Sequence, residues 1–465
     1  MKKESMRTQL TQLHPLRNKE TGFRGAKILR INRSTPLFLV VALYLVAQAY
    51  TLPIVTNGWW PTWIAIPDLL AALAGTTALF CDRKIDEGGS ILSAALAVAL
   101  FFLASYIFVT LGVSALVEGG VSVGAGFGGF QLVRMIQFVV LLWAVLRLPL
   151  TLHRVKVLRA LSFLAFSWVA ISVVLTKFQI VPTAEFGKHI PDSIEHSGPW
   201  LRYKYSTEGL GTIGYNHGYV ALQLLLLGGM ALSLGSSRPR GSILAIVLPI
   251  LLVATLLSGS RAGFAAALLF AAGILVRMVV RSPFVLVSTA LVMGGLWYGL
   301  KLPDEASDVL ERQRTIADPV DAENLSGRTA IWASHLEYIA ENPHVLLTGV
   351  GFGSAVMLGS NAHMMPLHVL LELGVLGLVA LVFLLFRAVK WMRRTSEVGF
   401  WLLVALIGSM YSQETLYPVV SFGHALGLFL LYCGLVEKQR SVFAQGLGKP
   451  RIPPHHDFPG HPTAA

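Results

Sequence analysis

The chain has 465 residues, of which 54% are hydrophobic and only 13% are charged, and its formal net charge is +12. Soluble domains carry about 25% charged residues, so this composition excludes an ordinary soluble domain and indicates a protein solvated by lipid. Because Lys and Arg collect in the cytoplasmic loops of membrane proteins, the basic balance does not indicate a nucleic-acid partner. We therefore expect an all-α, polytopic membrane protein.

About twelve segments are long and apolar enough to cross a bilayer, which takes roughly 20 residues of helix. In chain order they are 36–55, 62–81, 91–113, 128–148, 158–178, 212–235, 242–258, 263–281, 284–300, 365–388, 398–416 and 419–436. These segments predict transmembrane helices 1 to 9 within residues 36–300 and helices 10 to 12 within 365–436.

Basic residues predict the orientation of these helices. Residues 1–35 form a basic segment that we place in the cytoplasm. Every second connection is then also basic; its Lys and Arg residues are Arg83, Lys84, Arg147, Arg154, Lys156, Arg159, Arg238, Arg240, Arg277, Arg281, Arg387, Lys390, Arg393 and Arg394. The tail 437–465 falls on the same side, and its Pro, His and Gly content predicts disorder.

Two long connections fall on the outer face, at 179–211 and 301–364. The second carries a helical pattern from Ser326 to just before Pro343, and long structured loops are often functional. The apolar face expected for this helix consists of Ile331, Trp332, His335, Leu336 and Ile339.

Arg261 is a cation on the side of the membrane where the alternation predicts none, within Ser258-Gly259-Ser260-Arg261-Ala262-Gly263. A guanidinium binds phosphate bidentately, so we interpret Arg261 as an anion contact; the alternative is a snorkelling or helix-capping arginine. Arg134 lies near the outer end of segment 128–148. It could be a second contact to the same anion, or it could form a salt bridge with Asp68 or snorkel.

Arg328 is expected in the first turn of the loop helix, where a cation opposes the helix dipole and an anionic partner would compensate; an ordinary surface arginine is equally consistent. His363 lies where the loop re-enters the membrane, and a histidine there can exchange a proton near neutral pH. The alternative for His363 is a hydrogen bond that only supports helix packing.

The sequence has no HExxH motif and no cysteine cluster, so we predict no metal site. Gly349-Val350-Gly351-Phe352-Gly353 is interpreted as a tight turn, because it follows no strand of a βαβ unit.

Taken in order, these motifs resemble the O-antigen ligase and polymerase superfamily of bacterial envelope enzymes. The matching elements are the 211–217 stretch that ends in Asn216-His217, the Ser260-Arg261-Ala262-Gly263 element, Gly327-Arg328 with Trp332 and Asn342-Pro343, the 349–353 glycine motif, and His363 with Leu367, Glu372, Gly374 and Gly377. The last set resembles H-N-x-x-L-x-x-x-x-E-x-G, except that Met364 replaces the common Asn. Asn216-His217 stands where Pro-Asn is common.

The resemblance implies a GT-C-like, metal-independent, inverting glycosyltransferase without a cofactor, in the bacterial inner membrane. Its site would face the periplasm and take a glycan on undecaprenyl pyrophosphate. Its acceptor would be another glycan or lipid A core, and lipopolysaccharide or another polysaccharide the product. Arg261 and Arg328 would hold the pyrophosphate and His363 would assist the acceptor hydroxyl, so these three are the predicted catalytic residues. The predicted substrate-binding residues are Arg134, Asn216, His217 and Trp332.

We favour a repeat-unit polymerase of O-antigen or exopolysaccharide. A ligase that transfers the glycan to lipid A core would use the same donor, and the peptidoglycan polymerases of the shape and division family are a third enzyme class. A transporter of lipid-linked oligosaccharide is the alternative outside catalysis, although the chain shows none of the paired broken helices that transporters often have. A non-catalytic scaffold is the remaining one.

Overall fold

The computed structural model describes residues 34–51, 53–56, 63–81, 85, 88–112, 123–178, 180, 184–185, 208–209, 217–235, 241–278, 287, 290–291, 294, 328–358, 361–418 and 423–446. The described part is helical, with two short pairs of antiparallel strands. The helices of the first half are α1 (Thr35–Ala47), α2 (Ile66–Leu79), α3 (Gly89–Ser105), the π-helix η1 (Tyr106–Leu111), α4 (Val123–Arg147), α5 (Leu152–Lys177), α8 (His217–Ser233), α9 (Gly241–Leu257) and α10 (Arg261–Met278). Those of the second half are α13 (Arg328–Glu341), α14 (Pro343–Thr348), the 3-10 helix η5 (Ala355–Leu358), α15 (Met365–Thr395), α16 (Glu397–Ser409) and α17 (Gly423–Gly446).

Four described helices are long and apolar enough to cross a membrane: Gly89–Leu111, Ala125–Arg147, Leu152–Lys177 and Met365–Thr395. Six more are apolar but shorter: Thr35–Ala47, Ile66–Leu79, His217–Ser233, Gly241–Leu257, Arg261–Val276 and Glu397–Ser409. These helices agree with the predicted all-α membrane class. The prediction of about twelve spans stays a prediction, because most of segment 284–300 lies outside the described residues.

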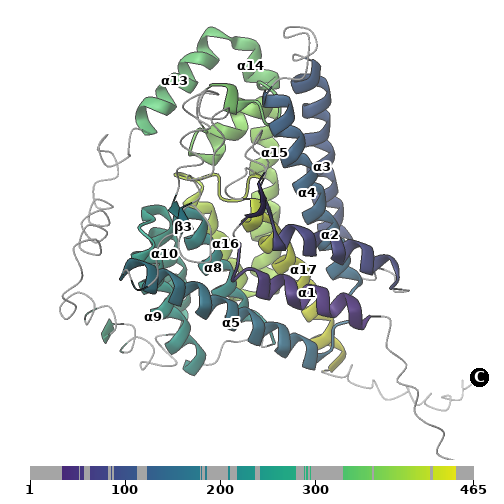
Figure 1. Cartoon of the computed structure of the whole chain (residues 1–465), viewed down its shortest axis with the longest axis vertical. Helices are drawn as coiled ribbons and strands as arrows, with labels where there is room; N and C mark the ends of the chain where they lie inside the picture. Colours follow the sequence, from purple (N-terminus) through teal and green to yellow (C-terminus); the bar gives the residue numbers. More distant parts are fainter. Residues whose placement is uncertain are drawn as a thin grey trace, which may run out of the picture.

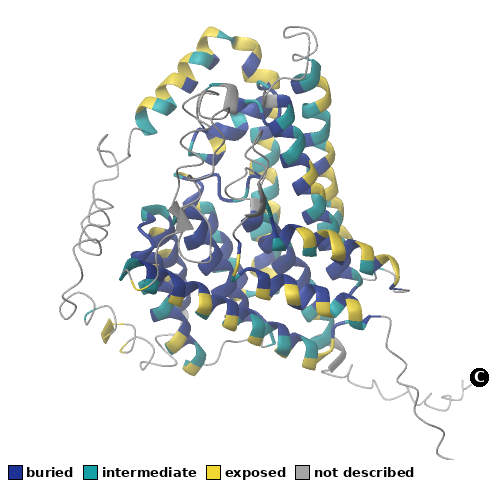
Figure 2. Ribbon diagram, viewed as in Figure 1, coloured by how far each residue is buried: buried dark blue, intermediate teal, exposed yellow. Residues whose placement is uncertain are grey.

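The helices pack around α8, in which every residue after His217 is buried (Figures 1 and 2). α8 contacts α5, α9, α10, α16 and α17, and α4 packs between α2, α3 and α17. Exposed residues gather instead on outer faces such as those of α3 and α13 (Figure 2). In the Gly89–Leu111 helix only 6% of the most apolar stretch is buried, as expected for a helix whose other faces contact lipid.

Segment 36–55 was predicted as one helix, and this is wrong after Ala47. The chain instead forms a hairpin of two antiparallel strands, β1 (Pro53–Thr56) and β2 (Trp63–Ala65). Pro53 cannot donate within a helix, and the β-branched residues that follow it favour a strand. A second short pair, β3 (Ala184–Glu185) with β4 (Glu208–Gly209), joins the two ends of the predicted outer loop 179–211.

The boundaries of the last three helices also differ from the prediction. α15 continues to Thr395 and only Ser396 separates it from α16, so Arg387, Lys390, Arg393 and Arg394 lie on a helix and not in a loop. Arg and Lys are good helix formers and are favourable near a helix C-terminus. Likewise α17 runs to Gly446, so residues 437–446 of the predicted disordered tail are helical. The remainder of that tail, and residues 1–33, lie outside the described residues.

The described part of the large outer loop packs onto the start of α15. Its buried apolar residues form a small cluster of their own, which consists of Ile339, Val345, Ala355, Ala362, Leu367 and Leu371. The predicted loop helix is confirmed as α13. Its expected apolar face is partly wrong, because Leu336 is 53% exposed whereas His335 and Ile339 are buried.

Candidate active site

The loop that leads into α15 holds His363 in an uncommon backbone conformation. Among the described residues, His363 is the only non-glycine residue with a positive φ, at 51°, a region that few side chains adopt. Its backbone N–H donates to Glu414 Oε1 at 2.6 Å. Two residues later, the N–H of Met365 donates to the carbonyl of Met410 at 2.9 Å. These bonds join the start of α15 to the 410–418 segment, which follows α16.

Glu414 lies behind the imidazole of His363. The distance from Nδ1 of His363 to Oε2 of Glu414 is 3.8 Å, and the histidine side chain is 31% exposed whereas the glutamate is fully buried. Burial opposes ionisation of Glu414, but the charges of His363 and His368, together with backbone hydrogen bonds, hold the pKa of this carboxyl below its usual value. A buried anion therefore faces one nitrogen of a partly exposed imidazole ring. The separation of 3.8 Å is longer than a hydrogen bond, but the arrangement resembles that of a catalytic base and the third group that orients it, whose contacts are often looser without substrate.

A second buried carboxylate, Glu372, stiffens the wall behind this pair. It accepts a 2.5 Å hydrogen bond from the hydroxyl of Tyr417 and a 3.2 Å bond from the N–H of Ala355. His368 Nε2 lies 3.5 Å from Glu372 Oε1, and its ring packs edge-on against Tyr417 with centroids 4.8 Å apart. The 410–418 segment is thus bonded to α15 through Met410 and Tyr417, and to His363 just before α15 through Glu414.

The 349–353 glycine motif is a tight turn, as predicted, and it packs backbone against backbone. Val350 and Gly351 donate to the carbonyls of Leu371 and Glu372 at 2.8 and 3.0 Å. Gly349 and Gly374 both have positive φ; a Cβ on the first would overlap the backbone of Glu372, and one on the second the carbonyl of Leu347. Only glycine meets both demands. The glycines therefore bring the outer loop onto α15, which kinks at Gly374.

The π-helix η1 and the end of α3 contact Phe352 of the same glycine motif through two hydrogen bonds. The hydroxyl of Thr110 donates to the carbonyl of Phe352 at 2.9 Å, and the N–H of Phe352 donates to Ser105 Oγ at 3.2 Å. A π-helix bonds residue i to i+5, so it places Ser105 and Thr110 on one face where both reach a single residue. The Phe352 ring then stacks on Phe102, with centroids 4.8 Å apart. This contact anchors the largely exposed α3 to the elements of the candidate site.

Arg261 is the first residue of α10 and is half-buried. Ser260, just before it, is buried, and its Oγ accepts hydrogen bonds from Gly263 N at 3.1 Å and from Gln413 Nε2 at 3.2 Å. Gln413 precedes Glu414 in the chain. The turn that carries Arg261 is therefore bonded to the same 410–418 segment that faces His363.

Arg328 is the first residue of α13, one helical turn before Trp332 on the same face. The indole of Trp332 donates to the carbonyl of Ala362 at 2.7 Å. Its ring also packs edge-on against Tyr411, with centroids 5.7 Å apart. Trp332 thus docks the start of α13 against the residue before His363. Each of the three predicted catalytic residues lies on an element that is bonded or packed to the 361–365 or 410–418 segments.

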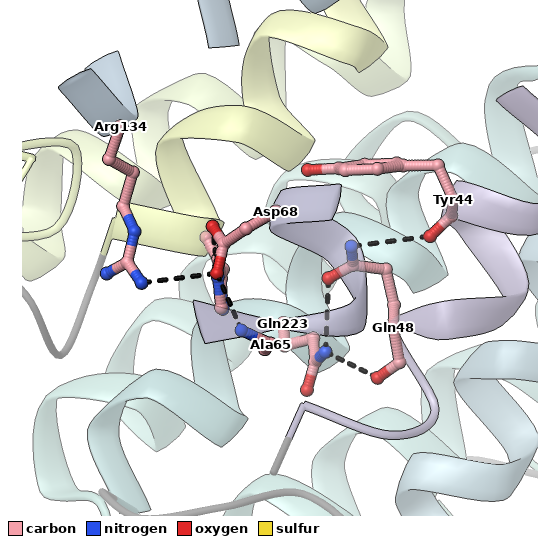
Figure 3. Close-up of polar contacts among 7 residues, drawn as sticks. Tyr44, Gln48, Ala65, Asp68, Arg134 and Gln223 are labelled. Atoms are coloured by element: carbon pink, nitrogen blue, oxygen red, sulfur yellow. Dashed lines mark hydrogen bonds and ion pairs between the residues drawn. The ribbon is translucent and has the colours of Figure 1, made fainter. Parts of the chain in front are cut away.

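Arg134 belongs to a different cluster, drawn in Figure 3. Its Nη2 lies 3.3 Å from Asp68 Oδ2, and both side chains are buried. Asp68 also accepts from the N–H of Ala65 at 2.9 Å, and His424 Nε2 lies 2.9 Å from its other oxygen. The predicted alternative, a salt bridge between Arg134 and Asp68, is confirmed, and it joins α2 to α4. His424 adds α17 to the cluster.

The other predicted substrate-binding residues are Trp332, His217 and Asn216, and the structure describes the first two. Trp332 lies beside the residues that precede the N-terminus of α15. His217 is the first residue of α8 and is half-buried. Asn216 lies outside the described residues.

Sequence reasoning missed Gln413 and Glu414. Both fall inside segment 398–416, which was predicted to be transmembrane, whereas α16 ends at Ser409. An ionisable residue within an apolar segment is a functional candidate by default, so Glu414 carried a usable signal. Its partner could not be read from the sequence, because His363 lies 51 positions away.

Residues 224–382 match a protein-family model described as O-antigen ligase. No curated protein matches the chain. The matched region contains Arg261, Arg328 and His363 and ends within α15, before the 410–418 segment. This match confirms, over residues 224–382, the resemblance to the O-antigen ligase and polymerase superfamily that the motifs predict.

Proposed function

We propose that this protein is a membrane glycosyltransferase that moves a glycan from undecaprenyl pyrophosphate to an acceptor hydroxyl on the outer face of the inner membrane. The observation that carries the proposal is the partly exposed imidazole of His363, backed by the buried carboxylate of Glu414. The 410–418 segment is hydrogen-bonded to the turn that carries Arg261, and the 361–365 segment is hydrogen-bonded to α13, which begins at Arg328.

In the proposed reaction, His363 is the general base. Because Nδ1 faces Glu414, the proposal assigns the transfer of the acceptor proton to Nε2. As the acceptor oxygen attacks the anomeric carbon, its proton passes to Nε2, and the bond between that carbon and the pyrophosphate oxygen breaks. A single displacement of this kind inverts the anomeric centre. The buried anion of Glu414 stabilises the imidazolium that forms, as the carboxylate does in a Ser-His-Asp triad.

The leaving pyrophosphate takes the bonding electrons and gains negative charge as the bond breaks. Arg261 and Arg328 would neutralise this charge, and fixed cations aimed at developing charge lower a barrier most effectively. Each arginine begins a helix, so each lies where backbone N–H groups and the helix dipole also favour an anion. With two arginines in this role, the proposed mechanism uses no metal ion. Arg134 is not part of the proposed contact set, because it is buried and paired with Asp68.

The acceptor separates two versions of the proposal. We favour a repeat-unit polymerase, in which the acceptor is a second lipid-linked glycan. The description of the matching family, O-antigen ligase, favours transfer to lipid A core as the second candidate.

Reconstitution tests the proposal. The full chain in proteoliposomes would receive a lipid-linked repeat unit, with and without lipid A core. A ladder of products is expected for a polymerase, and one product on lipid A core for a ligase. Donor that crosses the bilayer without a new glycosidic bond would overturn the proposal in favour of a transporter. Wild-type yield from His363→Ala would show that the site is misassigned.

A further inference from the structure

A cavity lies at the far ends of the helices that hold the candidate site. α15 begins beside His363, kinks at Gly374 and ends at Thr395; its 31 residues span at most about 46 Å at 1.5 Å each. α8 and α17 begin on the site side, and α16 ends there. Their opposite ends line a cavity of about 240 Å³ that opens to the protein surface, where Arg393, Arg394 and Arg440 are exposed. Charge alternation predicts that this end faces the cytoplasm.

The walls of this cavity are strongly basic. Arg393 and Arg394 come from the last turn of α15, and Arg440 comes from α17. Glu397, the first residue of α16, is the single acidic residue in the lining. Three positive charges therefore meet one negative charge around a small volume, beside the N-terminus of α16, whose dipole adds positive potential.

The uncharged polar groups of the lining are already engaged. Ser396 Oγ caps α16 by accepting from Gly399 N at 3.0 Å. Gln439 accepts from Gly235 N at 2.9 Å and donates to the carbonyl of Ser233 at 3.2 Å. By contrast, within the described part of the chain no carboxylate forms an ion pair with Arg393, Arg394 or Arg440. The groups that remain available to a ligand are the three guanidiniums.

We propose that this cavity binds a phosphate group, held by Arg393, Arg394 and Arg440. Guanidinium pairs with phosphate through two parallel N–H···O bonds, and arginines from two different helices can close on one such group. The cavity is smaller than the roughly 300–1,000 Å³ typical of drug-sized ligands, which suits a headgroup and not a whole lipid-linked glycan. Val436 and Phe443 add an apolar wall, and basic pockets between transmembrane helices bind anionic headgroups. The site is separate from the proposed catalytic one.

Lipid binding to the full chain in nanodiscs tests the proposal. The nanodiscs contain phosphatidylcholine alone, phosphatidylcholine with phosphatidylglycerol, or phosphatidylcholine with inorganic phosphate in the buffer. The test variants are Arg393→Gln/Arg394→Gln on α15 and Arg440→Gln on α17. The matched control is Arg387→Gln/Lys390→Gln, which removes two charges from the same helix outside the cavity lining. The readouts are the lipid that native mass spectrometry retains and the ligand dependence of the melting temperature.

We expect both test variants to weaken phosphate-group binding about ten- to a hundredfold, the size of one or two lost charged hydrogen bonds, and the control to bind like wild type. Stabilisation by phosphatidylglycerol alone would identify the ligand as a lipid headgroup, and stabilisation by inorganic phosphate as a soluble phosphate. The proposal is overturned if neither ligand binds, or if the control loses as much binding as the test variants. Should the double variant fold poorly, the exposed Arg440→Gln carries the test alone.

Discussion

Replacing Glu414 by glutamine tests the proposed base most directly. The amide keeps the size of the side chain and an oxygen that accepts from the backbone N–H of His363, but it removes the charge that lies 3.8 Å from Nδ1. Two unit charges at about 4 Å interact by roughly 4 kcal/mol at an effective dielectric constant of about 20. The imidazole is 31% exposed, so solvent screens part of this energy, and we expect about 1.4–2.8 kcal/mol to remain. That range corresponds to a ten- to hundredfold loss of kcat.

The pH dependence has a definite sign. The pKa of Glu414 is lowered, so its carboxylate is charged throughout the neutral range, and an anion beside an imidazole favours the protonated ring. A general base must be neutral, so activity rises with pH as the ring loses its proton. Without the anion the ring deprotonates more easily, and the acidic limb of the pH profile should move to lower pH by about one to two units.

The assay is the initial rate of glycan transfer in proteoliposomes, measured across pH with saturating donor. Glu414→Asp keeps the charge and should recover part of the rate, while its pH profile stays near that of wild type. Glu437→Gln is the control. Glu437 lies in the second half of α17, accepts a 3.2 Å hydrogen bond from Trp391, and has no role in the proposed reaction. If Glu414→Gln had the kcat and pH profile of wild type, Glu414 would not orient the base.

Three other predictions concern separate parts of the molecule. Arg261→Gln should lower kcat about 10²–10³-fold, as removal of one preorganised charge donor does, with little change in the melting temperature; an effect on KM alone would contradict its proposed role. Gly374→Ala should destabilise the protein by several kcal/mol, because φ is 66° and a Cβ would overlap the facing backbone, while Gly112→Ala, with open space around it, should melt near wild type. Asp68→Asn should cost about 3–5 kcal/mol by leaving Arg134 buried without its anion, and a variant that melts normally but loses donor affinity would instead assign Arg134 to the substrate.

Local sequence properties were sufficient for the membrane class and for most helices. Low charge and long apolar runs decide that a segment enters lipid, because the cost of exposing or burying each residue depends mainly on its own side chain. The motifs also indicated the superfamily, and Arg261, Arg328 and His363 were recognised as unusual for their places. The same reasoning explains the errors in the helix ends. Proline, capping and helix propensity determine where Thr35–Ala47 and Met365–Thr395 end, and average hydropathy does not include these effects.

Tertiary structure decided which polar residues meet. Arg134 was predicted with two possible partners, and packing of α2 against α4 brings it to Asp68, 66 positions away. Glu414 reaches His363, and Gln413 reaches Ser260 across 153 positions, only because the end of α16 lies beside the starts of α15 and α10. The free energy of such a contact depends on the distance and burial of two groups together. Composition and periodicity describe one segment at a time, so a pair that forms between segments becomes visible only once the helices are packed.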